Sequence, residues 1–429
     1  MDVVKIISTC TEIIKPSCPT PPHLKTYTLS LLDQFNIDGR YPMMLFYSAG
    51  TTQNSLKKSL AQTLSYYYPY AGRVNLDGCS IDCDDSGVPF IEAHVANTMS
   101  EILQRLEFDV LAQLLPFKND RTKLYANKSI IVVQVNYFSC GGVAITNYFK
   151  HVIADAPASI NFIKAWSDNH NQLYTCTINT STIIKDDVVF DCASVFPPQD
   201  LPLKALWEKC FLVSFPLGEA LVKRFTFDGT KMAALQTKIG DHPSRFEAVA
   251  TLILVAAADA ARERETDDVK PKNVALIPIN IRKRMNPPFP EKCLGNVGQA
   301  IVVKWQMEER IEYNSLSKRI RESVRKMDDK YARKLNESGG FLNDLENVNE
   351  EISEMNVYFV SSLCRSGLYE ADFGWGKAVW ANTLMKYNNC VVISDTNDGQ
   401  GIEAWVGLPK QDMATFQNNQ DILAYASFI

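Results

Sequence analysis

Segments patterned as strands alternate with segments patterned as helices along the whole chain. Short runs of apolar, β-branched and aromatic residues at 41–48 and 129–138 are typical of buried strands. The segments 54–67 and 157–166 instead space their apolar residues three or four positions apart, as one face of a helix requires. Because strand and helix patterns interleave rather than separate, the sequence predicts an α/β fold.

The second half of the chain repeats this alternation, and 429 residues are too many for one ordinary domain. Prolines and polar clusters loosen the pattern between 174 and 221, which is typical of a connecting segment. We therefore expect an N-terminal domain at 1–195, a crossover linker at 196–222 and a C-terminal domain at 223–429. In the second half the patterns predict helices at 246–262 and 315–335, a charged loop at 344–354, and strands at 273–281, 298–305, 356–361, 391–394 and 401–407.

Charge, hydrophobicity and cysteine content narrow the class of protein. A net charge of -5 gives no general basic face for nucleic acid. The N-terminus lacks the apolar core of a signal peptide, and the longest apolar run, 248–261, is shorter than the roughly 20 residues that cross a bilayer. The 11 cysteines have neither the paired spacing nor the neighbouring histidines of a zinc site. We therefore expect a soluble, cytoplasmic protein without a metal ion or a membrane anchor.

His151 has the clearest functional context among the five histidines of the chain. It lies just after a strand pattern and just before the helix pattern at 157–166, and loops at strand ends commonly carry catalytic groups. Asp155 follows four residues later, close enough to brace the loop or to orient the imidazole. This spacing alone is weak evidence, because such pairs also arise by chance. The other four histidines show no obvious partner.

A second motif, DFGWG at residues 372–376, is far less common by chance. HxxxD followed by DFGWG, in this order and spacing, resembles the plant BAHD acyltransferase family. Four further stretches agree. The first and the last of them look most similar to the branch that acylates alkaloid and terpenoid alcohols. These stretches are SCPTPPHLKTYTLSLLDQ at 17–34, YYYPYAGRV at 66–74, CDDSGVPFIEA at 83–93, and NIRKRMNPPFP at 280–290 followed by Gly295 and Asn296.

The resemblance covers nearly the whole chain and implies both a fold and a reaction. The fold would be two chloramphenicol-acetyltransferase-like α/β domains with mixed β-sheets and a tunnel between them, in a monomer. The reaction would transfer an acyl group from acyl-CoA, above all acetyl-CoA, to the hydroxyl of a small alkaloid or terpenoid alcohol in plant specialised metabolism. No cofactor would be bound permanently. N-acylation, or a malonyl or aroyl donor, stays open on the same fold.

Acyl transfer from a thioester gives His151 a specific task. A neutral imidazole, with an ordinary pKa of about 6.5, can take the proton from the acceptor hydroxyl as that oxygen attacks the thioester. The imidazolium can then protonate the departing sulfur. Direct attack in a ternary complex therefore needs no covalent acyl-enzyme, and the chain has no GxSxG motif that would indicate a serine nucleophile.

The resemblance also implies structural roles. Asp155 would turn away from the reacting groups and pair with Arg282, since a loop that carries a base must be held rigidly. DFGWG would lie far from the chemistry, because glycines around a tryptophan suit a tight, closely packed turn. The residues of this motif that support the fold would be Asp372, Gly374, Trp375 and Gly376.

Coenzyme A carries several phosphates, which bind to basic side chains and to backbone amides. We expect Ser244, Arg245 and Arg284 to contribute, although each is equally well explained as a solvated surface residue. Arg282 is left out of this set because it is expected to pair elsewhere.

Three positions depart from the family pattern, of which Ala158, where the family often has serine, carries little weight. Lys150 directly precedes the base, where its ammonium would lower the pKa of the imidazole unless it points to solvent. Ser361 keeps a hydroxyl donor in the expected oxyanion and acceptor pocket, but Leu363 stands where the family often has an indole. An oxyanion donor is typically worth about 10²–10³ in turnover. An altered or inactive family member therefore stays an alternative.

Overall fold

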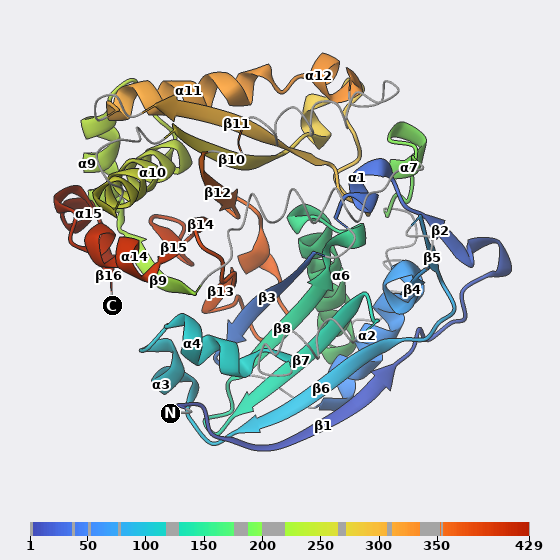
Figure 1. Cartoon of the computed structure of the whole chain (residues 1–429). Helices are drawn as coiled ribbons and strands as arrows, with labels where there is room; N and C mark the ends of the chain where they lie inside the picture. Colours follow the sequence, from blue (N-terminus) through green and yellow to red (C-terminus); the bar gives the residue numbers. More distant parts are fainter. Residues whose placement is uncertain are drawn as a thin grey trace. The chain divides into compact units, whose positions relative to one another are not determined.

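A computed structural model gives the structure of the chain (Figure 1). It confirms the α/β class, because helices pack around two mixed sheets. No helix among the described residues is long and apolar enough to span a membrane. The structure describes residues 3–36, 39–49, 53–75, 79–116, 128–175, 188–199, 219–264, 272–306, 311–334, 352 and 355–428.

The first compact unit is built on a six-stranded sheet with the strand order β1-β6-β7-β8-β3-β13. β6 and β7 run parallel, and the other neighbouring pairs run antiparallel. The strands predicted at 41–48 and 129–138 are confirmed as β3 and β7. The bounds are β1 Ile6–Ile14, β3 Arg40–Tyr47, β6 Val88–Val95, β7 Ile131–Phe138, β8 Val143–Lys150 and β13 Trp380–Thr383.

Two helices of the first unit, α2 (Gln53–Tyr66) and α6 (Ala156–Thr175), lie side by side behind this sheet (Figure 1). They confirm the helices predicted at 54–67 and 157–166. The apolar stripe of α2 faces the core, since Leu56, Leu60 and Leu64 are fully buried. Helical spacing of three leucines was therefore sufficient to identify the buried face.

The second compact unit holds a seven-stranded sheet with the order β11-β10-β12-β14-β15-β9-β16. β12 runs parallel to both of its neighbours, and the other pairs are antiparallel. All five strands predicted for the second half are confirmed in this sheet. The bounds are β9 Ala220–Phe227, β10 Lys272–Asn280, β11 Gly298–Gln306, β12 Asn356–Ser362, β14 Cys390–Asp395, β15 Ile402–Pro409 and β16 Ser427–Phe428.

The helices of the second unit gather around α10 (Arg245–Arg264), which confirms the helix predicted at 246–262. The single helix predicted at 315–335 is wrong, because the chain forms two. The first ends at Lys326, and Asp328 caps the start of the second by accepting a hydrogen bond from the Tyr331 amide at 2.9 Å. The predicted loop at 344–354 lies outside the described residues except for Ile352. The other helices are α9 Gly229–Ile239, α11 Tyr313–Lys326, α12 Asp329–Lys334, α14 Lys410–Gln417 and α15 Gln420–Tyr425.

Short elements complete the first unit, among them a small three-stranded sheet with the order β2-β5-β4. The helix α1 (Leu31–Gln34) of the first unit is four residues long but fully buried. The other short elements are β2 Thr26–Thr28, β4 Arg73–Val74, β5 Ser80–Asp82, α3 Met99–Leu103, α4 Phe108–Leu111 and α7 Cys192–Val195. The 3₁₀ turns of the first unit are η1 Pro22–Leu24, η2 Tyr68–Ala71, η3 Ala112–Leu114, η5 His151–Ile153 and η7 Leu368–Glu370, whereas η6 Arg282–Arg284 belongs to the second unit.

The two units are not contiguous in sequence, in contrast to the domains expected at 1–195 and 223–429. Strand β13 pairs antiparallel with β3 of the first unit, with Trp380 opposite Phe46. The strand β3 is almost entirely buried, and a buried strand needs partners for its amides and carbonyls on both sides. The expected linker and the expected tunnel stay predictions. The first unit comprises Met1–Leu201, Pro290–Val297 and Ser366–Leu384, and the second comprises Pro202–Phe289, Gly298–Arg365 and Met385–Ile429.

We predict that Leu60→Ala lowers the free energy of unfolding by about 2–5 kcal/mol, because it removes a fully buried side chain from the α2 stripe. Urea unfolding followed by circular dichroism would measure the change. The matched control is Lys58→Ala on the exposed side of the same helix, which should change stability by less than about 0.5 kcal/mol. Equal effects of the two substitutions would contradict the burial of the leucine stripe.

Candidate functional site

His151 opens the 3₁₀ turn η5, between the end of β8 and the start of α6, as the sequence predicted. Its backbone is held on both sides. The His151 amide donates to the Gly39 carbonyl at 2.6 Å, and the His151 carbonyl accepts from Asn296 Nδ2 at 2.8 Å. A Cβ atom at Gly39 would lie 2.9 Å from His151 Cβ, so the approach requires glycine. The imidazole therefore starts from a fixed main-chain position.

The His151 imidazole is half-buried and contacts the Tyr41 ring edge-on at 4.8 Å. The Tyr41 hydroxyl lies 2.9 Å from the Ala154 carbonyl and 2.6 Å from Ser159 Oγ, which fixes the ring. Burial lowers the pKa of His151 below its ordinary value, while its own carbonyl, Asp155 and the Asn296 side chain oppose this effect. A lowered pKa favours the neutral imidazole near neutral pH, which is the state that a general base requires.

Both carboxylate oxygens of Asp155 bind backbone amides. Its Oδ1 accepts from the Ala158 amide at 3.0 Å and caps the first turn of α6. Its Oδ2 accepts from the Val297 amide at 3.0 Å. The carboxylate thus ties the loop to the helix and to the segment Pro290–Val297, which agrees with the structural role expected for it.

The expected partner of Asp155, Arg282, belongs to the second unit. Arg282 is buried, and its amide and its Nη1 lie 3.0 and 3.3 Å from the Asn280 Oδ1 acceptor. Their pairing stays a prediction. Lys150, the other charge next to the loop, is half-buried at the end of β8, and its amide donates to the Ile130 carbonyl at 2.7 Å.

Asp33 and Asn296 were missed as site residues, although they hold the His151 loop. Asn296 Nδ2 donates both to the His151 carbonyl and to Asp33 Oδ1, each at 2.8 Å. The sequence carried a signal for Asp33, because Ser30-Leu-Leu-Asp33 has the spacing of a helix capping box, which the structure forms. Asn296 stood only in a stretch of family resemblance. No sequence pattern indicated that the two would meet.

Gly295 allows the segment Pro290–Val297 to pass close to this loop. It forms an isolated parallel bridge with Ala154. Its φ of +135° favours glycine, and a Cβ there would lie 2.5 Å from Cys192 Sγ. Cys192 Sγ in turn lies 2.9 Å from Cys293 Sγ. The segment is therefore packed tightly on both sides of Gly295.

The DFGWG motif forms a tight turn around one carboxylate oxygen. Asp372 Oδ1 accepts from the amides of Gly374, Trp375 and Gly376 at 2.7, 3.0 and 2.9 Å. Gly374 and Gly376 both have a φ of +86°, where a side chain would be strained. Phe373, which precedes Gly374, is fully buried. The geometry agrees with the structural role expected for the motif.

His170, which showed no partner in the sequence, anchors this turn to α6. Its Nδ1 lies 2.6 Å from the Phe373 carbonyl and its Nε2 lies 2.9 Å from Ser55 Oγ. Because a carbonyl only accepts, Nδ1 carries the proton and Nε2 accepts. His170 lies near the far end of α6 from Asp155, roughly 20 Å along the axis at about 1.5 Å per residue. The motif is thus separated from His151 by most of the helix.

Ser361 and Leu363 lie at the end of β12 in the second unit. Ser361 is half-buried opposite Val392, and Leu363 is buried with its amide bonded to the Ile393 carbonyl at 2.8 Å. Arg245 is tied to this region through Asp395, which accepts from its Nη2 at 2.6 Å and from the Arg365 amide at 2.6 Å. These expected residues therefore lie in one part of the second unit.

The other two residues expected to bind coenzyme A have different structural roles. Ser244 forms a capping box with Glu247 at the start of α10, with bonds of 2.7 and 3.2 Å. Arg284 Nη1 donates to the carbonyls of Val324 and Met327 at 2.9 and 3.1 Å, at the end of α11. Ser244 therefore marks a helix N-terminus, which suits an anion, whereas Arg284 caps a helix C-terminus.

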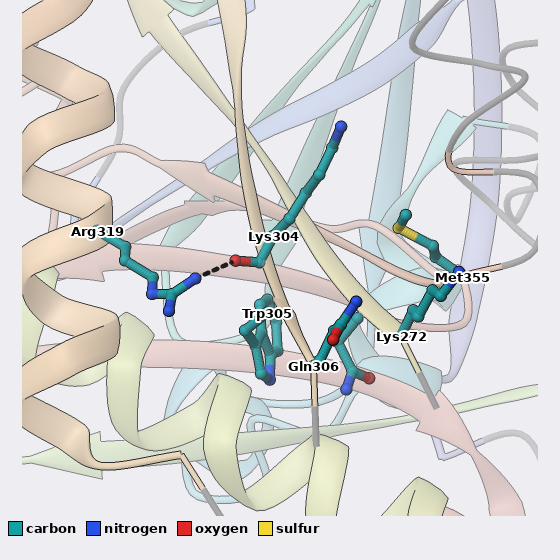
Figure 2. Close-up of a pocket in the computed structure, with 7 residues that line it drawn as sticks. Lys272, Lys304, Trp305, Gln306, Arg319 and Met355 are labelled. Carbon is teal, nitrogen blue, oxygen red and sulfur yellow. Dashed lines mark hydrogen bonds between the residues drawn. The ribbon is translucent and has the colours of Figure 1, made fainter. Parts of the chain in front are cut away.

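A hollow of about 480 Å³ lies beside β10 and β11 in the second unit (Figure 2). Arg319 Nη1 donates to the Lys304 carbonyl at 3.0 Å, and the Lys304 ammonium points away from the Arg319 guanidinium. The cationic groups do not converge, and none of the expected catalytic or coenzyme-binding residues lines the hollow. We assign it no part in the candidate site. Its lining is Lys272, Asn273, Lys304, Trp305, Gln306, Arg319 and Met355.

Comparisons with known proteins cover almost the whole chain. A family model described as "Transferase family" matches residues 4–423. A limonoid 21-O-acetyltransferase of Citrus sinensis is 43% identical, with 98% of this chain and 97% of the relative aligned. A limonoid 1-O-acetyltransferase of the same plant is 42% identical, with 99% of both chains aligned.

A solved structure is similar over the same length. The crystal structure of vinorine synthase, an enzyme of Rauvolfia serpentina, superposes with a TM-score of 0.79 at 30% identity. The match covers 99% of this chain and 98% of that chain. The expected chloramphenicol-acetyltransferase-like fold with mixed sheets is thereby confirmed.

We predict that Asp372→Ala destabilises the turn by at least about 1.5–3 kcal/mol, because three amides lose a charged acceptor. Asp372→Asn retains an Oδ1 acceptor and should lose less. Amide hydrogen exchange read by mass spectrometry should show lost protection in 371–376 and around His170, but not around Ala158. Loss of protection at both ends of α6 would contradict a local role for the motif.

Proposed function

Because the chain belongs to the Transferase family, the BAHD acyltransferases, we propose that it is an O-acetyltransferase that uses acetyl-CoA to acylate a hydroxyl of a limonoid-type terpenoid alcohol. Family membership makes the chain an acyltransferase. The 43% identity to a limonoid acetyltransferase over nearly the full length supports the donor and the acceptor class. Relatives named for two different hydroxyl positions are almost equally similar, so the proposal does not specify a position.

The single observation that carries the mechanism is the rigidly held, partly buried His151. Its imidazole takes the proton of the acceptor hydroxyl while that oxygen forms a bond to the thioester carbonyl carbon. The tetrahedral intermediate then expels the coenzyme A sulfur, which takes the proton from the imidazolium. The thioester is already activated, so one direct transfer is sufficient. A base that is neutral near neutral pH supports this sequence of events.

Asp155 is not a member of a charge relay in this proposal. Both of its oxygens accept from backbone amides, and its task is to keep the His151 loop in place. Ser361 would donate to the developing oxyanion, while Leu363 gives the pocket an apolar wall that suits a polycyclic acceptor. The undisturbed His151 loop opposes the inactive alternative. Coenzyme A phosphates would bind near Ser244 and Arg245, where the N-terminus of α10 favours an anion. A monomer in the cytoplasm stays the expectation.

We predict that His151→Ala lowers turnover by about 10²–10⁴-fold without unfolding the protein, because it removes the general base. Purified wild type and variant would be incubated with acetyl-, malonyl- or benzoyl-CoA and a panel of limonoid alcohols, and esters would be identified by mass spectrometry. The matched control is His23→Ala, an exposed histidine whose loss should not affect turnover. An ester formed only with malonyl- or benzoyl-CoA would refute the acetyl donor, and equal turnover in both variants would refute the base.

We also predict that the acid limb of kcat/KM lies below the ordinary imidazole pKa of about 6.5, because burial lowers the pKa of His151. The neutral imidazole is the active form, so activity is retained as the pH falls toward that lowered pKa and is lost below it. A series of kcat/KM measurements at constant ionic strength would locate the limb. A limb above the ordinary value would contradict a burial-dominated base.

A further inference from the structure

Asp33 is a fully buried carboxylate in the short helix α1. Its Oδ2 accepts from the Ser30 amide at 3.0 Å and from Ser30 Oγ at 2.7 Å. Its Oδ1 accepts from the Asn296 amide at 2.7 Å and from Asn296 Nδ2 at 2.8 Å. The carboxylate therefore divides its acceptor capacity between its own helix and a segment more than 260 residues away.

Capping a four-residue helix does not require a buried charge, because the Ser30 side chain alone supplies the N-cap. Burial raises the pKa of Asp33 to about 6, and the hydrogen bonds from Asn296 and Ser30 oppose this effect. Such a group is unfavourable in an interior unless its donors are in place. The second half of its bonding, to Asn296, therefore points to a role beyond α1.

The Asn296 side chain carries that role to His151. Its Nδ2 has two hydrogens, of which one goes to Asp33 Oδ1 and the other to the His151 carbonyl, each at 2.8 Å. Exchanging the amide nitrogen and oxygen would place an acceptor against two acceptors, so the network itself fixes the orientation of the amide. Asp33 thereby determines which way Asn296 points.

The orientation of Asn296 also matters for the imidazole. In this orientation the Asn296 Oδ1 acceptor is buried, and it belongs to the same side chain whose Nδ2 binds the His151 carbonyl. His151 Nδ1 is buried too, and neither atom has a hydrogen-bond partner among the described residues. The Asn296 side chain opposes the lowering of the His151 pKa by burial, which agrees with their proximity.

We propose that Asp33 and Asn296 are positioning residues for the reaction, with Asp33 Oδ1 orienting the Asn296 amide and that amide holding His151 in its reactive place. The inference rests on the proposed function, because it presumes that His151 is the base. It concerns the acceptor oxygen of Asp33, not the packing of α1. A misplacement of a catalytic group by about 1 Å can cost about 10²-fold in rate.

Two substitutions of Asp33 distinguish the role of its acceptor oxygen from the role of its charge. A substitution of Ser30 tests the stability of α1 separately from the Asp33 carboxylate. Asp33→Ala should lower kcat by about 10²-fold, with the KM of acetyl-CoA and of the acceptor changed less than about twofold. Asp33→Asn keeps an oxygen toward Asn296 and should recover most of kcat. Ser30→Ala removes the Ser30 hydroxyl from the other carboxylate oxygen, so it should lower the melting temperature while kcat is retained.

A second measurement tests position without any turnover. The rate at which diethyl pyrocarbonate modifies His151, mapped by peptide mass spectrometry over a pH series, gives the His151 pKa in the whole protein. Wild type and Asp33→Asn should show the same lowered pKa, and Asp33→Ala and Asn296→Ala should lower the pKa of His151 further, because the Asn296 side chain opposes the effect of burial. If the wild type transfers no acyl group but these shifts appear, the proposed function fails and the positioning role stands.

Three results would overturn the inference. Wild-type kcat in Asp33→Ala or Asn296→Ala would show that the amide does not position the base. Equal losses of kcat in Ser30→Ala and Asp33→Ala would assign the effect to α1 alone. If Asp33→Ala does not fold, Asn296→Ala must still lower kcat at constant KM, and an unchanged kcat there would refute the proposal.

Discussion

The loop between β8 and α6 depends on a short segment from a distant part of the chain. Pro290–Val297 contributes three successive ties: a bridge from Gly295 to Ala154, a hydrogen bond from Asn296 to the His151 carbonyl, and one from the Val297 amide to Asp155. Without them the loop would lose three ties and keep the bond of the His151 amide to Gly39 and that of the Tyr41 hydroxyl to the Ala154 carbonyl. The segment belongs to the first compact unit although its sequence neighbours belong to the second. The position of the base is therefore a long-range property of the fold.

These ties also explain why two acidic residues near one histidine have different tasks. Asp155 is half-buried and accepts from two amides, so its charge is used to fix the backbone. Asp33 is fully buried and acts through Asn296, at a distance of one side chain. The imidazole is left in a half-buried environment that lowers its pKa, and its basicity is set by burial more than by a neighbouring charge.

Periodicity predicted the place of His151 between a strand and a helix, because apolar spacing identifies buried faces directly. The regular elements that it predicted are the strands β3, β7, β10, β11, β12, β14 and β15 and the helices α2, α6 and α10. It could not predict that β13 pairs with β3, or that Asn296 meets Asp33, since periodicity says nothing about partners. The split of the helix at 315–335 depended on one side-chain cap at Asp328. Family resemblance supplied roles for Asp155 and DFGWG, which no spacing in this sequence established.

Helix α6 links the two motifs that identify the family. Asp155 caps its first turn, and His170 and Trp166 near its other end contact the DFGWG turn, with the Trp166 and Phe373 ring centroids 5.0 Å apart. The DFGWG turn precedes β13, which covers the edge of β3. Since β3 pairs on its other side with β8, and β8 leads into His151, a motif roughly 20 Å away along α6 supports the base through sheet order rather than through contact.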